Sequence, residues 1–373
     1  MNILLVYKSF PPVMGGVEFY LGMLADRLTV KGHQVRVVTT WNHFRSETEH
    51  HSMLTIERCG HWIEAASTPV SPSFFRSFRR WVGWSDLVHL NMPYPPADLA
   101  YWMLGGNRPL VITYHSDIIR QRVLGWLHRP LMKAVLNRSR RIMVSSQAYL
   151  ESSPVLCHYR DKCRIVPIGI PIETNPVSPE LQVRAEEIRR CHAPGPLVLF
   201  IGRMRHYKGL DIVIRSVERC PAVRLLVIGD GVMASSWRRM AEMGPARDRI
   251  CFLGDQDEYT KSAYLAASDM LVLPSVNRCE SWGLVLLEAM AHGLPLITTE
   301  LGTGTSVINQ DQFTGLVVPP DDVNALAAAI SRMATQPEQR REWGENARRR
   351  CLELYRIDPM IDRIEQVYHE TLS

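Results

Sequence analysis

The chain has 373 residues, of which 46% are hydrophobic and 22% are charged, a composition that excludes a single small module and a disordered chain. At about 100 to 200 residues per domain, this length predicts two domains. Residues 1–175 hold 20 Lys and Arg against 12 Asp and Glu, a net charge of +8, whereas residues 176–373 hold 23 against 26, a net charge of −3. The basic half is therefore expected to face an anionic substrate, a nucleic acid or a membrane surface, unless the asymmetry is due to chance.

The spacing of the cysteines and the hydropathy of the chain exclude several other classes. The eight cysteines form no CxxC pair, so neither a zinc site nor a disulfide framework is predicted. Residues 1–12 resemble a buried strand rather than a signal peptide, and no apolar stretch approaches the 18 residues of a membrane span. We therefore expect a protein of the reducing cytosol.

Short β-rich apolar runs alternate with longer helical patterns, which is typical of βαβ units around a parallel sheet. In the first half the predicted strands are residues 3–7, 35–40, 87–91, 110–114, 141–145 and 164–167. Four prolines between residues 167 and 179 then indicate an extended connection. In the second half the predicted strands are residues 197–201, 224–229, 250–253, 270–274, 294–299 and 315–318, followed by helical sequence. The pattern predicts two doubly wound α/β halves with a ligand in the cleft between them.

The first strand leads into a paired-glycine turn, Gly15-Gly16, and then into a helical pattern that extends to about Lys31. Such a turn either lets backbone amides approach an anion or is a plain tight turn. A dinucleotide-binding fold would show GxGxxG here and an acidic residue at the end of the second strand, which instead ends Thr39-Thr40-Trp41. An NAD-dependent oxidoreductase is thus disfavoured, and no GxxxxGK[ST] motif supports an NTPase.

A basic turn follows the first strand of the second half. It carries Arg203, Arg205, His206 and Lys208 immediately before a predicted helix, whose amino terminus already has a partial positive charge. This arrangement is unfavourable unless an anion such as pyrophosphate binds there. The alternative is a solvated basic turn.

Further along the chain, glycines and carboxylates follow successive strands. Gly229-Asp230-Gly231 either lets the backbone approach a flat ligand or forms a plain turn, and residues 302–306 combine glycines with hydroxyls. A loop carries Glu280, and Gly283 opens an apolar helix that bears Glu288. If the carboxylate of Glu288 is buried, it needs donors such as ribose hydroxyls; otherwise it is an ordinary exposed helix carboxylate.

The chain resembles the family 4 glycosyltransferases in the order of Gly202-Arg203 to Lys208-Gly209, Gly229-Asp230-Gly231, and Glu280 with Glu288 in ESWGLVLLEAMAHGLP. The resemblance covers nearly the whole chain. It implies the GT-B fold, in which two Rossmann-like domains face each other across a cleft, and retaining transfer from a nucleotide-diphospho-sugar. It also implies an acceptor domain at 1–175, a donor domain at 176–354, and a final helix at about 355–373 that packs back on the first domain.

The resemblance assigns roles to individual residues of the donor domain. Arg203 and Lys208 would hold the donor diphosphate and stabilise the negative charge that develops on it. Glu288 would hold the ribose. Glu280 and the backbone of residues 281–283 would hold the donor sugar.

In the first domain, the resemblance places His115 near the reacting sugar and Gly16 at the phosphate. The expected catalytic residues are therefore His115 and Glu280, and the expected donor-binding residues are Gly15, Gly16, Arg203, Lys208, Gly229, Asp230, Ser281, Trp282, Gly283, Leu284 and Glu288. Trp282 departs from the family, in which phenylalanine is more frequent. The expected mechanism is same-face attack with the leaving phosphate taking the acceptor proton, without a cofactor or a metal ion.

Aromatic side chains and arginines are interleaved in residues 74–84, and further cations follow between residues 120 and 141. They suit an anionic bilayer and a lipid-diphosphate-linked saccharide acceptor; the alternative is a solvated basic face with the aromatics in the core. Residues 115–121 and 301–306 resemble bacterial mannosyl- and deoxymannosyltransferases of O-antigen assembly, which implies a GDP-sugar. We thus expect a hexosyltransferase of lipopolysaccharide biosynthesis, peripheral on the cytoplasmic face of the inner membrane, with glycosyltransferases of the same pathway as candidate partners.

Three different functions stay open at this point. One is that of a UDP-sugar-dependent glycosyltransferase of the same fold. Another is that of a GT-B sugar-nucleotide epimerase or phosphorylase. The third is nucleic-acid binding, which the basic half would favour, although the chain contains no recognisable nucleic-acid module.

Overall fold

The computed structural model describes the chain apart from residues 14, 62, 66–67, 118–121 and 173–177. The chain divides into two units: unit 1 comprises Met1–Pro167 and Asp358–Ser373, and unit 2 comprises Ile168–Ile357. The chain therefore enters unit 2 at Ile168, whereas the boundary expected at 175–176 lies outside the described residues. No helix among the described residues is long and apolar enough to cross a membrane.

Unit 1 is built on an eight-stranded sheet. Its strands are β1 (Asn2–Val6), β2 (Gln34–Trp41), β3 (Glu47–His50), β4 (Leu54–Gly60), β7 (Leu87–Met92), β8 (Leu110–Tyr114), β9 (Arg141–Val144) and β10 (Cys163–Ile165). They lie in the order β10-β9-β8-β7-β1-β2-β4-β3, and β3 is antiparallel to β4 in an otherwise parallel sheet. The central strand is apolar throughout, since Ile3–Val6 is fully buried between helical layers.

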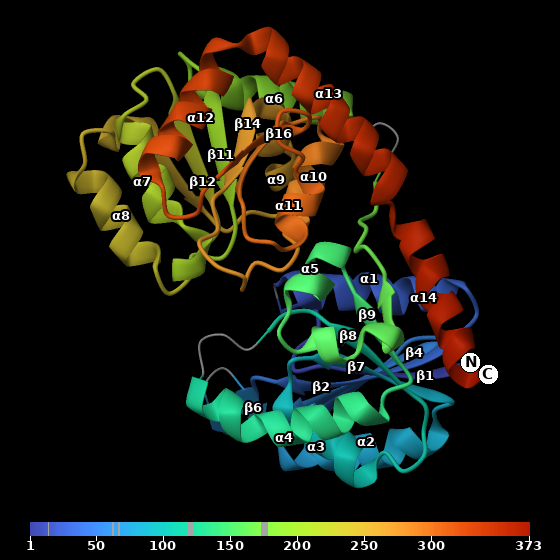
Figure 1. Cartoon of the computed structure of the whole chain (residues 1–373). Helices are drawn as coiled ribbons and strands as arrows, with labels where there is room; N and C mark the ends of the chain where they lie inside the picture. The colour runs from blue at the N-terminus through green and yellow to red at the C-terminus, as the bar shows by residue number, and fades with distance from the viewer. Residues whose placement is uncertain (14, 62, 66–67, 118–121, 173–177) are drawn as a thin grey trace. The chain divides into compact units, whose positions relative to one another are not determined.

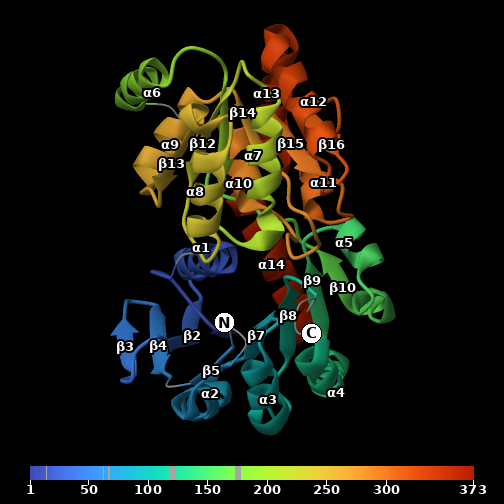
Figure 2. The ribbon, with the colours of Figure 1, turned by 90° about the vertical axis from the view of Figure 1, so that its left-hand side faces the viewer.

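The helices of unit 1 lie on both faces of its sheet. Figures 1 and 2 show α1 (Gly16–Val30) on one face and α2 (Pro72–Trp84), α3 (Pro95–Leu104) and α4 (Arg122–Arg138) on the other. A short helix α5 (Gln147–Ser152) and the 3₁₀ turns Leu156–His158 and Arg160–Lys162 follow β9. A small hairpin of β5 (Ile63–Ala65) and β6 (Thr68–Val70) precedes α2.

The last helix, α14 (Ile357–Leu372), belongs mostly to unit 1 and packs beside α1. The hydroxyl of Tyr368 lies 2.8 Å from Nδ1 of His89 in β7, and Nζ of Lys31 lies 2.6 Å from Oδ1 of Asp362. Because Tyr368 is fully buried, this end of the chain is part of the core of unit 1.

The sequence analysis missed β3 and β4, and the structure gives the reason. β3 is an edge strand whose residues are mostly exposed, so it has no apolar run. β4 is buried along its whole length but contains Glu57 and Arg58, which interrupt its hydrophobic pattern. Burial of these charged side chains depends on partners elsewhere in the unit, such as Glu49 for Arg58.

Unit 2 is built on a six-stranded parallel sheet. Its strands are β11 (Leu197–Ile201), β12 (Arg224–Ile228), β13 (Ile250–Gly254), β14 (Met270–Leu273), β15 (Leu296–Thr299) and β16 (Gly315–Val318). The order β13-β12-β11-β14-β15-β16 reverses direction between β11 and β14, as the order of the first sheet does between β1 and β7. Both units are thus doubly wound and Rossmann-like, as predicted, and each has a switch point where ligands bind in such folds.

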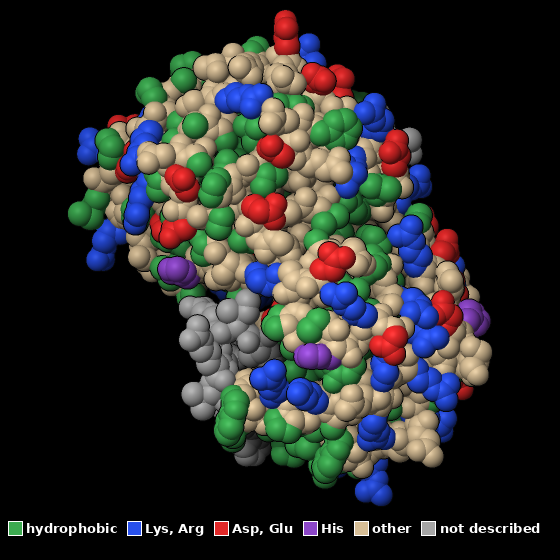
Figure 3. Space-filling model, in the orientation of Figure 1, with side chains coloured by type: hydrophobic (Ala, Val, Ile, Leu, Met, Phe, Trp, Pro, Cys, Tyr) green, Lys and Arg blue, Asp and Glu red, His purple; other side chains and the backbone are tan. Residues whose placement is uncertain are grey.

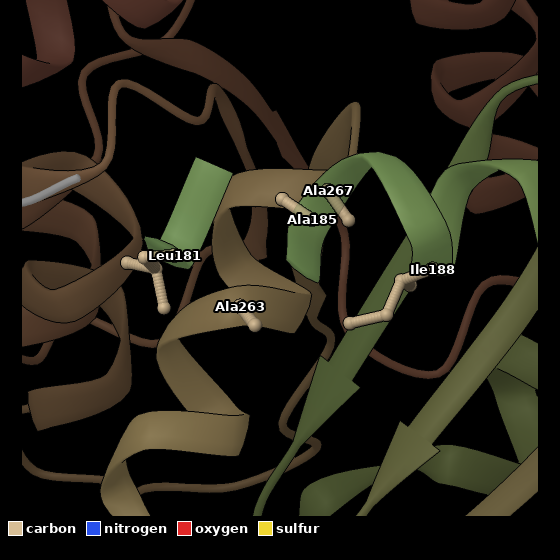
Figure 4. Close-up of a cluster of buried hydrophobic side chains, with 5 residues drawn as sticks. All are labelled: Leu181, Ala185, Ile188, Ala263 and Ala267. Atoms are coloured by element: carbon tan, nitrogen blue, oxygen red, sulfur yellow. The ribbon is translucent and has the colours of Figure 1, made fainter. Parts of the chain in front are cut away.

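Helices lie around the sheet of unit 2 (Figure 1). They are α6 (Pro179–Cys191), α7 (Leu210–Glu218), α8 (Ala234–Met243), α9 (Glu258–Ala267), α10 (Leu284–Ala291), α11 (Gly304–Ile308), α12 (Val323–Thr335) and α13 (Pro337–Leu354). Figure 4 shows how α9 is anchored on α6: its small residues Ala263 and Ala267 pack with Leu181, Ala185 and Ile188.

The two segments at which the chain enters and leaves unit 2 are paired with each other. The amide of Ile170 donates to the carbonyl of Tyr355 at 2.9 Å, and the amide of Ile357 donates to the carbonyl of Ile170 at 3.0 Å. At Gly169, a Cβ would lie 2.4 Å from the carbonyl oxygen of Arg356, so only glycine allows this approach. Both segments therefore form one short parallel bridge within unit 2.

Candidate active site

Two loops meet at the switch point of unit 2, one after β11 and one after β14. They bring together Lys208 and Glu280, whose Nζ and Oε2 atoms lie 2.5 Å apart. The hydroxyl of Ser275 donates to the same carboxylate oxygen at 3.1 Å. The structure therefore joins the residue expected at the diphosphate to the residue expected at the donor sugar.

Lys208 and Glu280 are 9% and 7% exposed. Burial is the largest influence and would lower the pKa of Lys208, but the charge and hydrogen bond of Glu280 and the nearby Tyr207 together outweigh it, and the pKa lies above its ordinary value. Lys208 is thus a fixed cation next to a carboxylate, ready to pair with an anionic ligand.

Glycines hold the loops after β11 and β12 against each other and against β14. Gly229, with φ of 123°, would place a Cβ 2.3 Å from the carbonyl oxygen of Gly202. Gly209 precedes α7 with φ of 70°, and its Cβ would lie 2.3 Å from the carbonyl oxygen of Pro274. The left-handed backbone and the close approach both require glycine at these positions.

Arg203 and Asp230 lie on the same two loops, and both are exposed. Among the described residues Arg203 has no ion pair, so its guanidinium is free to bind an anion. Asp230 accepts a hydrogen bond from the amide of Gly231 at 2.6 Å, and its carbonyl accepts one from the amide of Met204 at 2.8 Å. Asp230 therefore shapes the turn.

Glu288 lies on α10, and its side chain is 19% exposed. Its Oε2 is 3.0 Å from Nζ of Lys261 on α9, and Lys261 is also 2.8 Å from Glu258. Burial raises the pKa of Glu288, and the Lys261 ammonium acts in the opposite direction. The sequence analysis missed Lys261, because no local motif marks it.

The segment from Ser281 to Leu284 opens α10. The carbonyl of Ser281 accepts a hydrogen bond from the amide of Gly304 at 2.8 Å, which joins this segment to the glycine turn after β15. Gly283 caps α10 with φ of 87°, in the left-handed region, and the half-buried Leu284 is the first residue of the helix. The helix amino terminus thus begins beside Glu280, where its partial positive charge favours an anionic or polar ligand.

The ring of Trp282 points into the core of unit 2. Trp282 is 3% exposed, and its Nε1 donates to the carbonyl of Ile168 at 3.1 Å. Its ring meets the edge of Tyr355 with 5.8 Å between centroids, and Gly304 leaves the room that the ring needs. A phenylalanine could not donate the hydrogen bond to Ile168, so the larger side chain has a structural role.

In unit 1, Gly15 and Gly16 lie at the amino terminus of α1, which follows the switch-point strand β1. A Cβ on Gly15 would lie 2.1 Å from Oε2 of Glu18, so the glycine makes room for this carboxylate. Oε1 of Glu18 accepts a hydrogen bond from the hydroxyl of Ser9 at 2.5 Å. Glu18, which the sequence analysis did not single out, therefore occupies the first turn of α1.

His115 follows β8 and is 8% exposed. Its Nε2 lies 2.9 Å from Oδ1 of Asn91, whose amide nitrogen donates to the carbonyl of Val6, so Nε2 of His115 carries the proton. Burial lowers the pKa of His115 to about 3. The imidazole is thus neutral at pH 7 and has Nδ1 as its acceptor.

Unit 1 also has an open groove of about 750 Å³ along α1 and the β3–β4 hairpin. Asp26, Glu49 and Arg58 line it together with apolar side chains, and none of the expected site residues does. Among the described residues, no group of three or more His, Cys, Asp or Glu could hold a metal ion.

Two family models match the chain in succession. Residues 14–174 match the model of Glycosyltransferase Family 4, and residues 186–350 match that of Glycosyl transferases group 1.

Curated relatives match over nearly their whole length. The chain is 35% identical to the D-rhamnosyltransferase WbpZ of Pseudomonas aeruginosa, over 95% of the chain and 92% of the relative. It is 32% identical to the O-antigen chain mannosyltransferase C of Escherichia coli, over 100% of the chain and 99% of the relative.

Solved structures share the fold. Sucrose-phosphate synthase from Thermosynechococcus elongatus matches with a TM-score of 0.79 and 24% identity, over 99% of the chain and 98% of that structure. Anabaena HepE in complex with UDP and glucose matches with a TM-score of 0.77 and 18% identity, over 99% of both chains. With two Rossmann-like units, two matching family models and full-length relatives, the chain belongs to the family 4 glycosyltransferases and has their GT-B fold.

Proposed function

We propose that this glycosyltransferase moves a hexose, mannose or a deoxymannose, from a GDP-sugar onto a lipid-linked glycan in O-antigen biosynthesis, with retention of configuration. The observation that carries the proposal is the buried Lys208–Glu280 pair at the switch point of unit 2, beside the exposed cation Arg203. A nucleotide-diphospho-sugar combines an anionic diphosphate with sugar hydroxyls, so its site needs cations for the first and a carboxylate acceptor for the second.

The proposed chemistry follows from these residues. The acceptor hydroxyl attacks the anomeric carbon, the bond from that carbon to the phosphate oxygen breaks, and the departing phosphate takes the hydroxyl proton. Negative charge grows on the diphosphate, where Lys208 and Arg203 stabilise it. Glu280 accepts hydrogen bonds from the sugar hydroxyls and remains paired with Lys208.

We propose that unit 1 contributes Gly16 and His115. The neutral imidazole of His115 accepts a hydrogen bond at Nδ1 from a sugar hydroxyl while Asn91 holds Nε2. A cation at this position would oppose the positive charge that develops on the sugar ring, so the neutral form is the suitable one.

The relatives support the choice of sugar and acceptor. One is named a D-rhamnosyltransferase and the other an O-antigen chain mannosyltransferase, and D-rhamnose is a deoxymannose. Both matches cover at least 95% of this chain, which favours a hexose of the manno configuration and an O-antigen glycan as acceptor.

A ligand panel tests the donor. Thermal shifts are measured with UDP, GDP, ADP and their sugars, and the best donor is then incubated with a lipid-linked O-antigen fragment. We expect the largest shift with GDP and GDP-mannose or GDP-rhamnose, and an α-linked product by NMR. A β-linked product would contradict retention, and a larger shift with UDP would favour a UDP-sugar as the donor.

The same assay distinguishes glycosyl transfer from the epimerase, phosphorylase and nucleic-acid-binding functions. Turnover of the donor without any acceptor would favour a sugar-nucleotide epimerase, and dependence on free phosphate would favour a phosphorylase. Salt-dependent binding to DNA or RNA without nucleotide-sugar binding would favour a nucleic-acid-binding protein.

We also propose peripheral binding to an anionic membrane through α3 and α4. Phe74 and Phe78 of α2 are fully buried, so the interleaved aromatics of residues 74–84 lie partly in the core rather than at a membrane surface. Trp102 and Met103 of α3 and Trp126 and Leu127 of α4 are instead 51% to 70% exposed.

Figure 3 shows hydrophobic side chains gathered over α3 and α4, with Lys and Arg beside them. Exposed cations of α2 and α4 among the described side chains are Arg76, Arg79, Arg80, Arg129, Lys133 and Arg138; Arg120 lies outside the described residues. Apolar side chains with cations beside them favour insertion at the surface of an anionic bilayer, which fits a lipid-linked acceptor.

A further inference from the structure

A lysine of α9 reaches the carboxylate expected at the donor ribose. Nζ of Lys261 lies 3.0 Å from Oε2 of Glu288 and 2.8 Å from Oε2 of Glu258. The side chain of Lys261 is 14% exposed, that of Glu288 is 19% exposed and that of Glu258 is 67% exposed. The interaction with Glu288 is therefore the one shielded from water, and the interaction with Glu258 is screened.

The contact leaves one side of Glu288 available. Its Oε1 accepts no hydrogen bond from the described residues, and Lys261 is the only one of them that pairs with its carboxylate. His292, which follows the last residue of α10, bonds through Nδ1 to the backbone carbonyl of Glu288 at 2.9 Å and not to the carboxylate. The carboxylate is thus held at one oxygen and open at the other.

The fold fixes the position of Lys261. On α9, Ala263 and Ala267 lie about 200° and 240° around the helix from Lys261, so they occupy the opposite face. That face packs against α6 (Figure 4), and Asp257 caps the helix through a hydrogen bond from the amide of Thr260 at 2.8 Å. Since α9 is held at its face and at its amino terminus, the lysine reaches Glu288 from a fixed base.

We propose that Lys261 is a positioning residue that orients Glu288 for the two ribose hydroxyls and so makes the site selective for ribonucleotides. This inference rests on the proposed function, in which Glu288 binds the donor ribose. Lys261 does not touch the nucleotide in this scheme. It holds Oε2 by a charge-assisted hydrogen bond, which fixes the plane of the carboxylate and leaves Oε1 open to the ribose.

The charges around Glu288 agree with this role. Burial favours the neutral form of the carboxyl, Glu258 acts in the same direction, and Lys261 favours the ionised form. An ionised carboxylate has acceptor sites left for both hydroxyls, at the open Oε1 and at the second lone pair of Oε2, whereas a protonated one loses an acceptor site. A site that bonds hydroxyls rejects analogues that lack them, because its buried groups are then left unpaired.

The experiment measures nucleotide affinity by titration calorimetry with GDP and 2′,3′-dideoxy-GDP, or with UDP and its dideoxy analogue if UDP binds more tightly. The variants are Lys261→Met, Lys261→Arg, Glu288→Gln and Glu258→Gln in the full chain. Lys261→Met is expected to weaken the binding of GDP about tenfold and that of dideoxy-GDP less than twofold, because the analogue has no ribose hydroxyls for Glu288 to bind. Lys261→Arg is expected to retain most of the difference in affinity between the two nucleotides. Glu258→Gln is expected to bind GDP with an affinity within about twofold of that of the native chain.

Equal weakening of both nucleotides by Lys261→Met would overturn the inference, because a purely structural ion pair has no preference for hydroxyls. If Glu288→Gln alone abolishes the discrimination and Lys261→Met does not, Glu288 binds ribose but Lys261 does not position it. If Glu288→Gln leaves GDP binding unchanged, the ribose assignment fails, and with it the inference. Should Lys261→Met not fold, Lys261→Gln replaces it, with the same discrimination expected.

Discussion

Nζ of Lys208 lies 2.5 Å from Oε2 of Glu280, and both side chains are buried at the carboxyl ends of neighbouring strands. The pair joins two loops that are far apart in the sequence. An unpaired charge in this place would be costly, so the two residues depend on each other for stability as well as for the proposed donor binding.

The pair predicts an asymmetric response to substitution. Lys208→Met leaves the Glu280 carboxylate buried without its cation and is expected to lower the free energy of unfolding by about 3 to 5 kcal/mol. The double variant Lys208→Met/Glu280→Gln removes both charges and is expected to recover much of this loss, although glycosyl transfer is lost in both. Urea unfolding and turnover are measured in parallel for the double variant and for Lys208→Met and Glu280→Gln alone. If the double variant loses as much free energy of unfolding as the two single variants together, the two residues are not coupled.

The hydrogen bond from Trp282 to the carbonyl of Ile168 predicts an effect of replacing the indole with the phenylalanine common in the family. Trp282→Phe leaves this carbonyl without its donor and is expected to cost about 1 kcal/mol of stability. Trp126→Phe, at a position that is 70% exposed, is the matched control and should change stability little. Equal unfolding midpoints for the two variants would argue against a structural role of the indole.

The docking of α14 predicts that the end of the chain stabilises unit 1. Ile364 is fully buried on this helix, so Ile364→Ala is expected to lower the free energy of unfolding by about 2 to 5 kcal/mol. Arg363→Ala, at the exposed neighbouring position, is the control and should stay within about 0.5 kcal/mol of the native chain. An unaffected midpoint in Ile364→Ala would mean that α14 is not part of the cooperative unit.

Two buried histidines predict acid sensitivity. Burial lowers the pKa of His115 and of His89 to about 3, below the value of about 6.5 in the unfolded chain. As the pH falls below 6.5, these histidines take up protons in the unfolded chain but not in the folded chain. The free energy of unfolding therefore decreases by up to about 1.4 kcal/mol per pH unit for each histidine. Urea unfolding between pH 7 and pH 5 measures the slope, and His89→Gln is expected to reduce it; an unchanged slope would mean that His89 titrates normally in the fold.

The exposed surface of α3 and α4 predicts binding to anionic vesicles. Trp126→Ser/Leu127→Ser is expected to reduce vesicle binding about tenfold in flotation, because two apolar side chains no longer insert. Turnover of a water-soluble acceptor should be unchanged. Val232→Ser, at an exposed position of unit 2, is the control; equal binding of the native chain to neutral and anionic vesicles, or to neither, would refute the membrane proposal.

Much of the site could be predicted from the sequence because of the way parallel sheets are built. Glu280 follows β14 and Arg203 and Lys208 follow β11, and the carboxyl ends of neighbouring parallel strands meet at one edge of the sheet. The cations and the carboxylate at these strand ends then indicate a ligand with an anionic group and several hydroxyls. The strands β3 and β4, at one edge of the sheet of unit 1, could not be predicted in this way. β3 has no apolar run, and Glu57 and Arg58 interrupt the apolar run of β4.

The sequence by itself determined the two doubly wound units and the order of the motifs along their strands, because hydrophobic periodicity and glycine turns are local signals. The tertiary structure decided which side chains pair. It placed Lys261 on Glu288, aimed the ring of Trp282 at Ile168 and buried Tyr368 against His89. Each of these contacts joins residues on separate elements, and its geometry depends on how the elements pack, which no local pattern encodes.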